Sequence, residues 1–177
     1  MKKGFTLIEL LIVIGILAIL ATTVVLVLNP AQLLAQARDS QRMSDLTSVK
    51  SAIALYLATA TSPAVSATSY GTVSTGCWFG TGCTTACSGV STSTAVNGAG
   101  WVPIDLVGTA GGSPLSALPL DPSQTATYQY AYIGDATHLT FELNANLEST
   151  KYSGLEATDG GNCPSVYEIG TAPGLAL

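Results

Sequence analysis

The sequence predicts an α+β protein in which one long N-terminal helix packs against a small antiparallel β-sheet. Two observations carry this prediction. Up to residue 61 the chain is rich in apolar residues at helical spacing, and residues 127–177 contain short alternating segments typical of paired strands. Residues 62–126, rich in Gly, Ser, Thr and Ala, separate these two parts as a connecting loop. At 177 residues the chain is expected to form one domain with appendages.

The first helical stretch, residues 5–28, is long and apolar enough to cross a membrane. A helix of this length rises about 36 Å, against a hydrocarbon core of roughly 30 Å. Lys2 and Lys3 precede it, so we expect the N-terminus in the cytoplasm and the remaining chain outside. A secretory signal peptide or a plain anchor would also begin this way. Glu9 argues against both, because an acid within a membrane span is costly without a partner.

The stretch Lys2-Lys3-Gly4-Phe5-Thr6-Leu7-Ile8-Glu9 resembles the processing and methylation motif of type IV prepilins and pseudopilins. The resemblance implies that residues 1–4 are a leader, which a membrane prepilin peptidase removes after Gly4. It implies that Phe5 becomes the methylated N-terminus. It also implies that Glu9 pairs with the N-terminal amine of a neighbouring subunit during assembly. The alternative for Glu9 is an interfacial acid that reaches toward the headgroups.

The second helical stretch, residues 29–61, is amphipathic. Asn29-Pro30 predicts a kink or short break at its start, because proline disfavours helix at the preceding residue. Its apolar stripe consists of Met43, Leu46, Val49 or Lys50, Ile53 and Leu57. A charged cluster lies in its first half: Arg38, Asp39, Arg42 and Asp45. We expect this cluster to be a solvated face, with a subunit contact as the alternative, and an Asp39–Arg42 pair one turn apart.

Four cysteines lie beyond the apolar stretch: Cys77, Cys83, Cys87 and Cys163. An even number in a Gly- and Ser-rich region favours two disulfides in an oxidising compartment, with three possible connectivities. Free thiols are less favoured. A metal site is least favoured, because the paired spacing of common zinc sites is missing. The aromatic side chains near the cysteines, Trp78, Phe79 and Trp101, are expected to cover a local core rather than form an adhesive patch.

Residues 127–177 are expected to form a sheet and a C-terminal loop. The alternating residues of a predicted hairpin are Tyr128, Tyr130 and Tyr132 on one strand and Leu139, Phe141 and Leu143 on the other. Gly134-Asp135 is the predicted turn, and residues 165–169 a further strand. The sheet should pack on the apolar stripe. This order resembles the pilin fold.

A calcium site is a weaker alternative that the resemblance implies, because some pseudopilins bind calcium in a C-terminal loop. Oxygen ligands here would come from Glu156, Asp159 and Asn162. An ordinary acidic turn is the favoured alternative, since no EF-hand spacing is present. We therefore predict no bound metal and no cofactor.

The rest of the sequence favours a structural protein. Only Lys151 is basic beyond residue 51, against eight acids, so direct nucleic-acid binding is not expected. A single histidine, His138, lacks the partners of a nucleophilic triad, and no phosphate-binding loop is present. The resemblance then implies a non-enzyme that assembles with itself into an extracytoplasmic or cell-surface filament, on a pilus or type II secretion platform. The alternatives are the major pseudopilin of a type II secretion system and a minor adhesive tip pilin.

Overall fold

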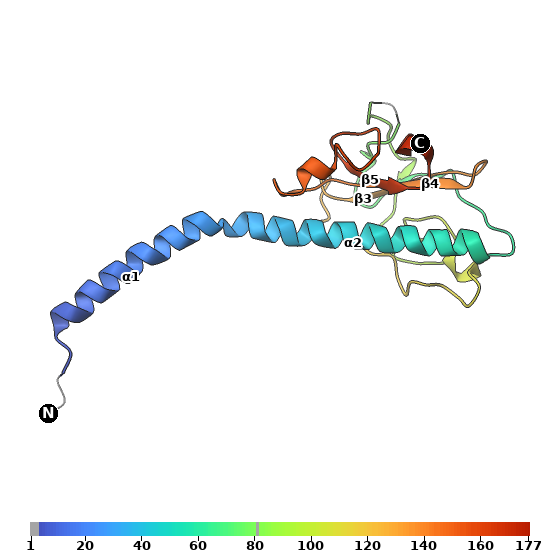
Figure 1. Cartoon of the computed structure of the whole chain (residues 1–177). Helices are drawn as coiled ribbons and strands as arrows, with labels where there is room; N and C mark the ends of the chain where they lie inside the picture. The colour runs from blue at the N-terminus through green and yellow to red at the C-terminus, as the bar shows by residue number, and fades with distance from the viewer. Residues whose placement is uncertain (1–3, 81) are drawn as a thin grey trace.

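The computed structural model describes residues 4–80 and 82–177 of the chain. Two consecutive helices, α1 (Leu7–Leu28) and α2 (Pro30–Thr59), form one long bent rod. A small head domain packs along α2, and α1 extends beyond it (Figure 1). The predicted architecture, a long helix against a small and mostly antiparallel sheet, is confirmed.

The rod bends at Asn29, the residue between the two helices. Asn29 has a left-handed backbone (φ 40°, ψ 76°), a conformation that Asn tolerates better than most residues. Its side chain accepts a hydrogen bond from the Gln32 N–H at 3.4 Å and so caps α2. Pro30 occupies the first helical position, where a missing N–H costs nothing. The predicted break at Asn29-Pro30 is confirmed.

The head contains a five-stranded sheet with the order β2-β1-β3-β4-β5. The strands are β1 (Tyr70–Gly71), β2 (Gly89–Val90), β3 (Tyr130–Asp135), β4 (Thr140–Ala145) and β5 (Tyr167–Gly170). All neighbouring strands pair antiparallel except β1 and β2, which are parallel. Three short 3₁₀ helices complete the head: η1 (Leu106–Gly108), η2 (Ser153–Leu155) and η3 (Pro173–Leu175).

The β3–β4 hairpin differs in detail from its prediction. The predicted turn at Gly134-Asp135 is wrong, because both residues belong to β3 and the turn is formed by residues 136–139. Gly134 serves close packing instead: a Cβ there would lie 2.4 Å from Val65 Cγ1. Asp135 holds the turn by accepting a hydrogen bond from the Thr137 N–H at 2.7 Å. Leu139, predicted in the strand, lies in this turn with φ 55°.

The main core lies between α2 and one face of the sheet. The predicted stripe supplies Leu46, Val49 and Ile53, all fully buried. The facing residues of the sheet are Tyr130, Tyr132, Phe141, Leu143 and Ala145. Tyr128, predicted on the same strand, precedes β3.

The connecting region packs as a second layer instead of forming a detached loop. Cys77, Phe79 and Cys87 pack on Ala131, on the sheet face turned away from the main core. The later part of the region returns to the main core, where Trp101 is fully buried. Both faces of the sheet are therefore covered.

Candidate functional site

The N-terminal motif begins α1 with a reciprocal cap. The Thr6 hydroxyl accepts a hydrogen bond from the Glu9 N–H at 3.3 Å. The Glu9 carboxylate accepts one from the Thr6 N–H at 2.8 Å and one from the Thr6 hydroxyl at 2.7 Å. This capping box satisfies backbone donors that the first helical turn leaves unpaired. Glu9 is therefore held at the helix start, with its side chain on the surface.

The predicted processing point lies in an extended segment before α1. Gly4 and Phe5 are exposed, and a Cβ built on Gly4 meets no atom within 4 Å. The Phe5 side chain is 78% exposed. The Gly4–Phe5 bond is therefore not covered by the described part of the chain. Residues 1–3 of the predicted leader lie outside the described residues.

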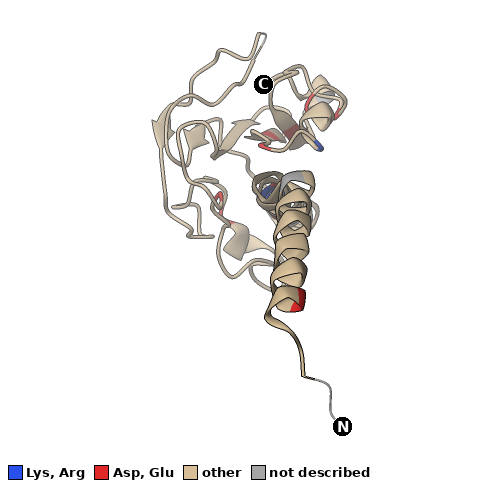
Figure 2. Cartoon of the chain, turned by 90° about the vertical axis from the view of Figure 1, so that its left-hand side faces the viewer, with Lys and Arg blue, Asp and Glu red and all other residues tan. Residues whose placement is uncertain are grey.

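The surface of α1 is apolar and unpartnered within the chain. Among its described side chains none is buried, and Glu9 is the charged one (Figure 2). By length and composition this helix is apolar enough to cross a membrane. Its Thr22 and Thr23 hydroxyls donate back to carbonyls of the preceding turn, so they add little polarity.

A buried charge cluster fixes α2 to the head. Arg42 is fully buried and donates to Asp39 at 2.8 Å, to Asp121 at 2.6 Å and to Glu148 at 2.6 Å. Arg38 forms a second ion pair with Glu148. The Arg38 hydrogen bond, with help from Arg42, lowers the pKa of Glu148 to about 2. These contacts join α2, the segment before β3 and the segment after β4.

The expectation of a solvated face for the charged cluster is wrong. Asp39 and Arg42 form the predicted pair, but both are 0% exposed. Asp39 also accepts hydrogen bonds from the backbone N–H groups of Glu148 and Ser149, at 2.9 and 2.8 Å. Asp45 accepts a hydrogen bond from the Tyr130 hydroxyl at 2.8 Å. The alternative of a subunit contact does not fit Asp39 or Arg42 either, because their side chains are covered by their own head.

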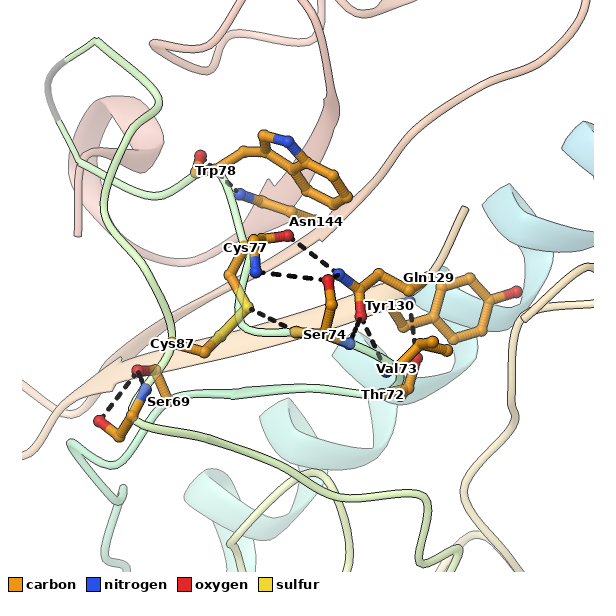
Figure 3. The surroundings of a disulfide bond; sticks show 12 residues. Ser69, Thr72, Val73, Ser74, Cys77, Trp78, Cys87, Gln129, Tyr130 and Asn144 are labelled. Carbon is orange, nitrogen blue, oxygen red and sulfur yellow. Dashed lines mark hydrogen bonds between the residues drawn. A yellow bond between two sulfur atoms is a disulfide. The ribbon is translucent and has the colours of Figure 1, made fainter. Parts of the chain in front are cut away.

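Two disulfides tie the outer layer together, and the prediction of disulfides is confirmed. Cys77 pairs with Cys87, and Cys83 with Cys163. The first encloses a short loop, and the buried amide of Gln129, the residue before β3, anchors the segment that leads into Cys77 (Figure 3). Gln129 Oε1 accepts hydrogen bonds from the backbone N–H groups of residues 73 and 74 at 2.8 and 2.7 Å.

Two of the three calcium candidates, Glu156 and Asp159, already accept hydrogen bonds within the fold. Glu156 accepts a hydrogen bond from the Leu147 N–H at 2.8 Å. Asp159 accepts from Gly161 at 2.9 Å and from Glu168 at 2.7 Å. The Asn162 side-chain oxygen has no hydrogen-bond partner within the described part of the chain. No cluster of three His, Cys, Asp or Glu side chains suited to a metal occurs among residues 4–80 and 82–177.

Sequence reasoning missed several residues that the structure brings into these sites. Thr6 could have been found, because Ser or Thr three residues before Glu at the start of an apolar run is the capping-box signature. Asp121 and Glu148 could not have been identified from the sequence as partners of Arg42, because they lie far along the chain from it. Tyr128, whose ring lies 4.9 Å from the Arg42 guanidinium, gave no signal beyond its place in the alternation.

Comparison with known proteins identifies the start of the chain. Residues 1–25 match the family model described as the prokaryotic N-terminal methylation motif. This motif is the N-terminus of type IV pilins and pseudopilins. Searches of curated proteins and of solved structures found no match to the chain. The matched residues include Gly4, Phe5 and Glu9, so the motif and the capped start of α1 coincide.

Proposed function

We propose that this type IV pilin-like protein, a structural and not an enzymatic chain, is the repeating subunit of a pilus-like filament. Its precursor is anchored by α1, cut after Gly4 by a prepilin peptidase, methylated at Phe5 and polymerised by an assembly platform. The observation that carries the proposal is α1 itself, an apolar helix with one acid whose described side chains are all exposed, within and beyond the methylation motif. Such a surface needs either lipid or other copies of the same helix.

Glu9 supplies the specific contact in this proposal. In the precursor its carboxylate binds Thr6. Cleavage after Gly4 would create an amine at Phe5, one helical turn away. A carboxylate and an amine in an apolar bundle each become less costly when they pair. Pairing between neighbouring subunits would set the axial register of the helices.

The substitution Glu9→Ala tests this contact. We expect normal membrane insertion but a loss of sheared filaments of at least about tenfold, because an unpaired amine would remain in the helix bundle. Mass spectrometry of the variant should still show a chain that begins at methylated Phe5, which places the defect after processing. Thr22→Ala is the matched control, since the Thr22 hydroxyl bonds only within its own helix. Wild-type filament levels for Glu9→Ala would refute the proposal.

The same shearing assay separates the finer roles. A surface fraction dominated by this chain supports a major pilin exported as a filament. A chain confined to the membrane supports instead the major pseudopilin of a type II secretion system or a minor tip pilin. We favour the major pilin, because the surface of the head is poor in charge and in exposed large apolar side chains, as bulk packing requires.

A further inference from the structure

The outer face of the sheet buries a polar patch that lies outside the sites described above. Glu142, Asn144 and Glu168 lie on β4 and β5, and none is more than 2% exposed. Asn144 is opposite Glu168 in the strand register, and Glu142 is opposite Gly170. Because alternate residues of a strand face the same way, the three side chains are neighbours on one face, away from α2.

Each of the two carboxyl groups has one bonded oxygen and one unbonded oxygen. Glu142 Oε2 accepts a hydrogen bond from the Leu177 N–H at 3.1 Å. Glu168 Oε2 accepts one from the Cys163 N–H at 2.7 Å. The other oxygen of each, and Asn144 Oδ1, have no hydrogen-bond partner among the described residues. A buried oxygen without a donor is costly, and two buried carboxylates on neighbouring strands are more so.

The groups packed around the patch do not neutralise it. Asp159 adds a further acid from the loop before β5, where it accepts the Glu168 N–H. Lys50 of α2 lines the same open pocket as Glu168 and Asp159, but in the described chain it forms no ion pair with either. The chain end at Leu177 lies against Glu142, and Cys83 and Cys163 are joined in a disulfide. The local charge is therefore negative.

We propose that Glu142 and Glu168 share a single proton, and that this acid–carboxylate pair latches the edge strand β5 and the disulfide-linked loop onto β4. The proton supplies the donor that these two diagonally placed carboxyl groups lack. It also removes one of two like charges. A proton fits better than a metal ion, because no metal-binding cluster occurs in the described part of the chain.

The expected pH dependence follows from burial. Burial, reinforced by the neighbouring Glu142 and Asp159 charges, raises the pKa of Glu168 to about 8. Burial also raises the pKa of Glu142. In the unfolded chain Glu168 has its ordinary pKa of 4.5, so the protonated pair stabilises the folded state fully below pH 4.5. This stabilisation is lost as the pH rises through the folded-state pKa of about 8.

Thermal unfolding of the full chain in detergent micelles, at pH 5 and pH 9 and with EDTA, tests the latch. For the wild type, Tm should fall on the order of 10 °C between these pH values. Glu168→Gln keeps a neutral donor at this position and should remove most of that fall. The matched control is Asp105→Asn, an exposed acid that accepts a hydrogen bond from the Val107 N–H, which the amide can also accept. The control should behave as the wild type.

Three results would overturn the proposal. One is a Glu168→Gln variant that keeps the wild-type pH dependence. Another is a wild-type Tm at pH 9 that calcium raises and EDTA lowers, which would assign the patch to a cation. Because the variant can fail to fold, infrared spectra of the wild type provide a direct readout. A buried protonated carboxyl band should be present at pH 6 and lost above pH 9, and its absence at pH 6 would rule out the shared proton.

Discussion

At the scale of single residues, Arg42 is central to the attachment of the head to the rod. Its guanidinium donates to three carboxylates from three separate segments, those of Asp39, Asp121 and Glu148. Only arginine offers enough donors in a fixed plane to serve several carboxylates at once. A lysine would bring the charge without this geometry.

We predict that Arg42→Met lowers the free energy of unfolding by about 3–5 kcal/mol, because it leaves several buried carboxylates without their cation. Urea unfolding of the full chain in detergent measures this. The control is Arg38→Met, whose side chain is 37% exposed and, within the described residues, pairs with Glu148 alone. It should cost clearly less than Arg42→Met, because solvent screens an exposed ion pair. Equal losses for the two variants would show that the cluster does not depend on Arg42.

At the scale of elements, the two disulfides should contribute unequally. Cys83–Cys163 links residues 80 apart, and Cys77–Cys87 residues 10 apart. In the chain-entropy account the longer loop gives about 4.5 kcal/mol and the shorter about 2.7 kcal/mol. We therefore expect the double Ser variant of the 83–163 pair to unfold at lower urea than that of the 77–87 pair. The reverse order would mean that native packing, and not loop closure, dominates.

The long helices could be predicted because their signals are local. The apolar run, the Asn29-Pro30 break and the residues Leu46, Val49 and Ile53 are all read within a few turns of chain. The second layer could not be predicted from the sequence, because it depends on contacts between segments that lie far apart in the chain. In β4 the alternation correctly places Phe141 and Leu143 toward α2. The same alternation turns Glu142 away from α2, yet Glu142 is fully buried there and accepts a hydrogen bond from the Leu177 N–H near the chain end.

The turn of the hairpin was missed for a related reason. A Gly-Asp pair is a strong local turn signal, but Gly134 is required by the close approach of Val65 from another segment. Asp135 then caps the true turn from the end of its strand. Tertiary packing thus decided the role of a glycine whose sequence context favoured a turn.

At the scale of the whole molecule, apolar and polar surfaces are separated along the rod. The apolar surface is concentrated on α1, while the acids after Glu9 lie on α2 and the head (Figure 2). This division suits a chain that has two environments in succession, first lipid around α1 and then other copies of α1. The head keeps its own core and disulfides in both, because its core residues come from α2 and the sheet.

The last prediction concerns the orientation of the precursor. Lys2 and Lys3 before the apolar helix favour a cytoplasmic N-terminus, so the head with its four cysteines should lie outside, where disulfides persist. Intact cells treated with a membrane-impermeant maleimide should show no labelling of the head before reduction and labelling after it. Protease added to spheroplasts should digest the head and leave a fragment containing α1. A head that resists protease until the membrane is opened, with cysteines that react without reduction, would reverse the orientation and remove the route to a surface filament.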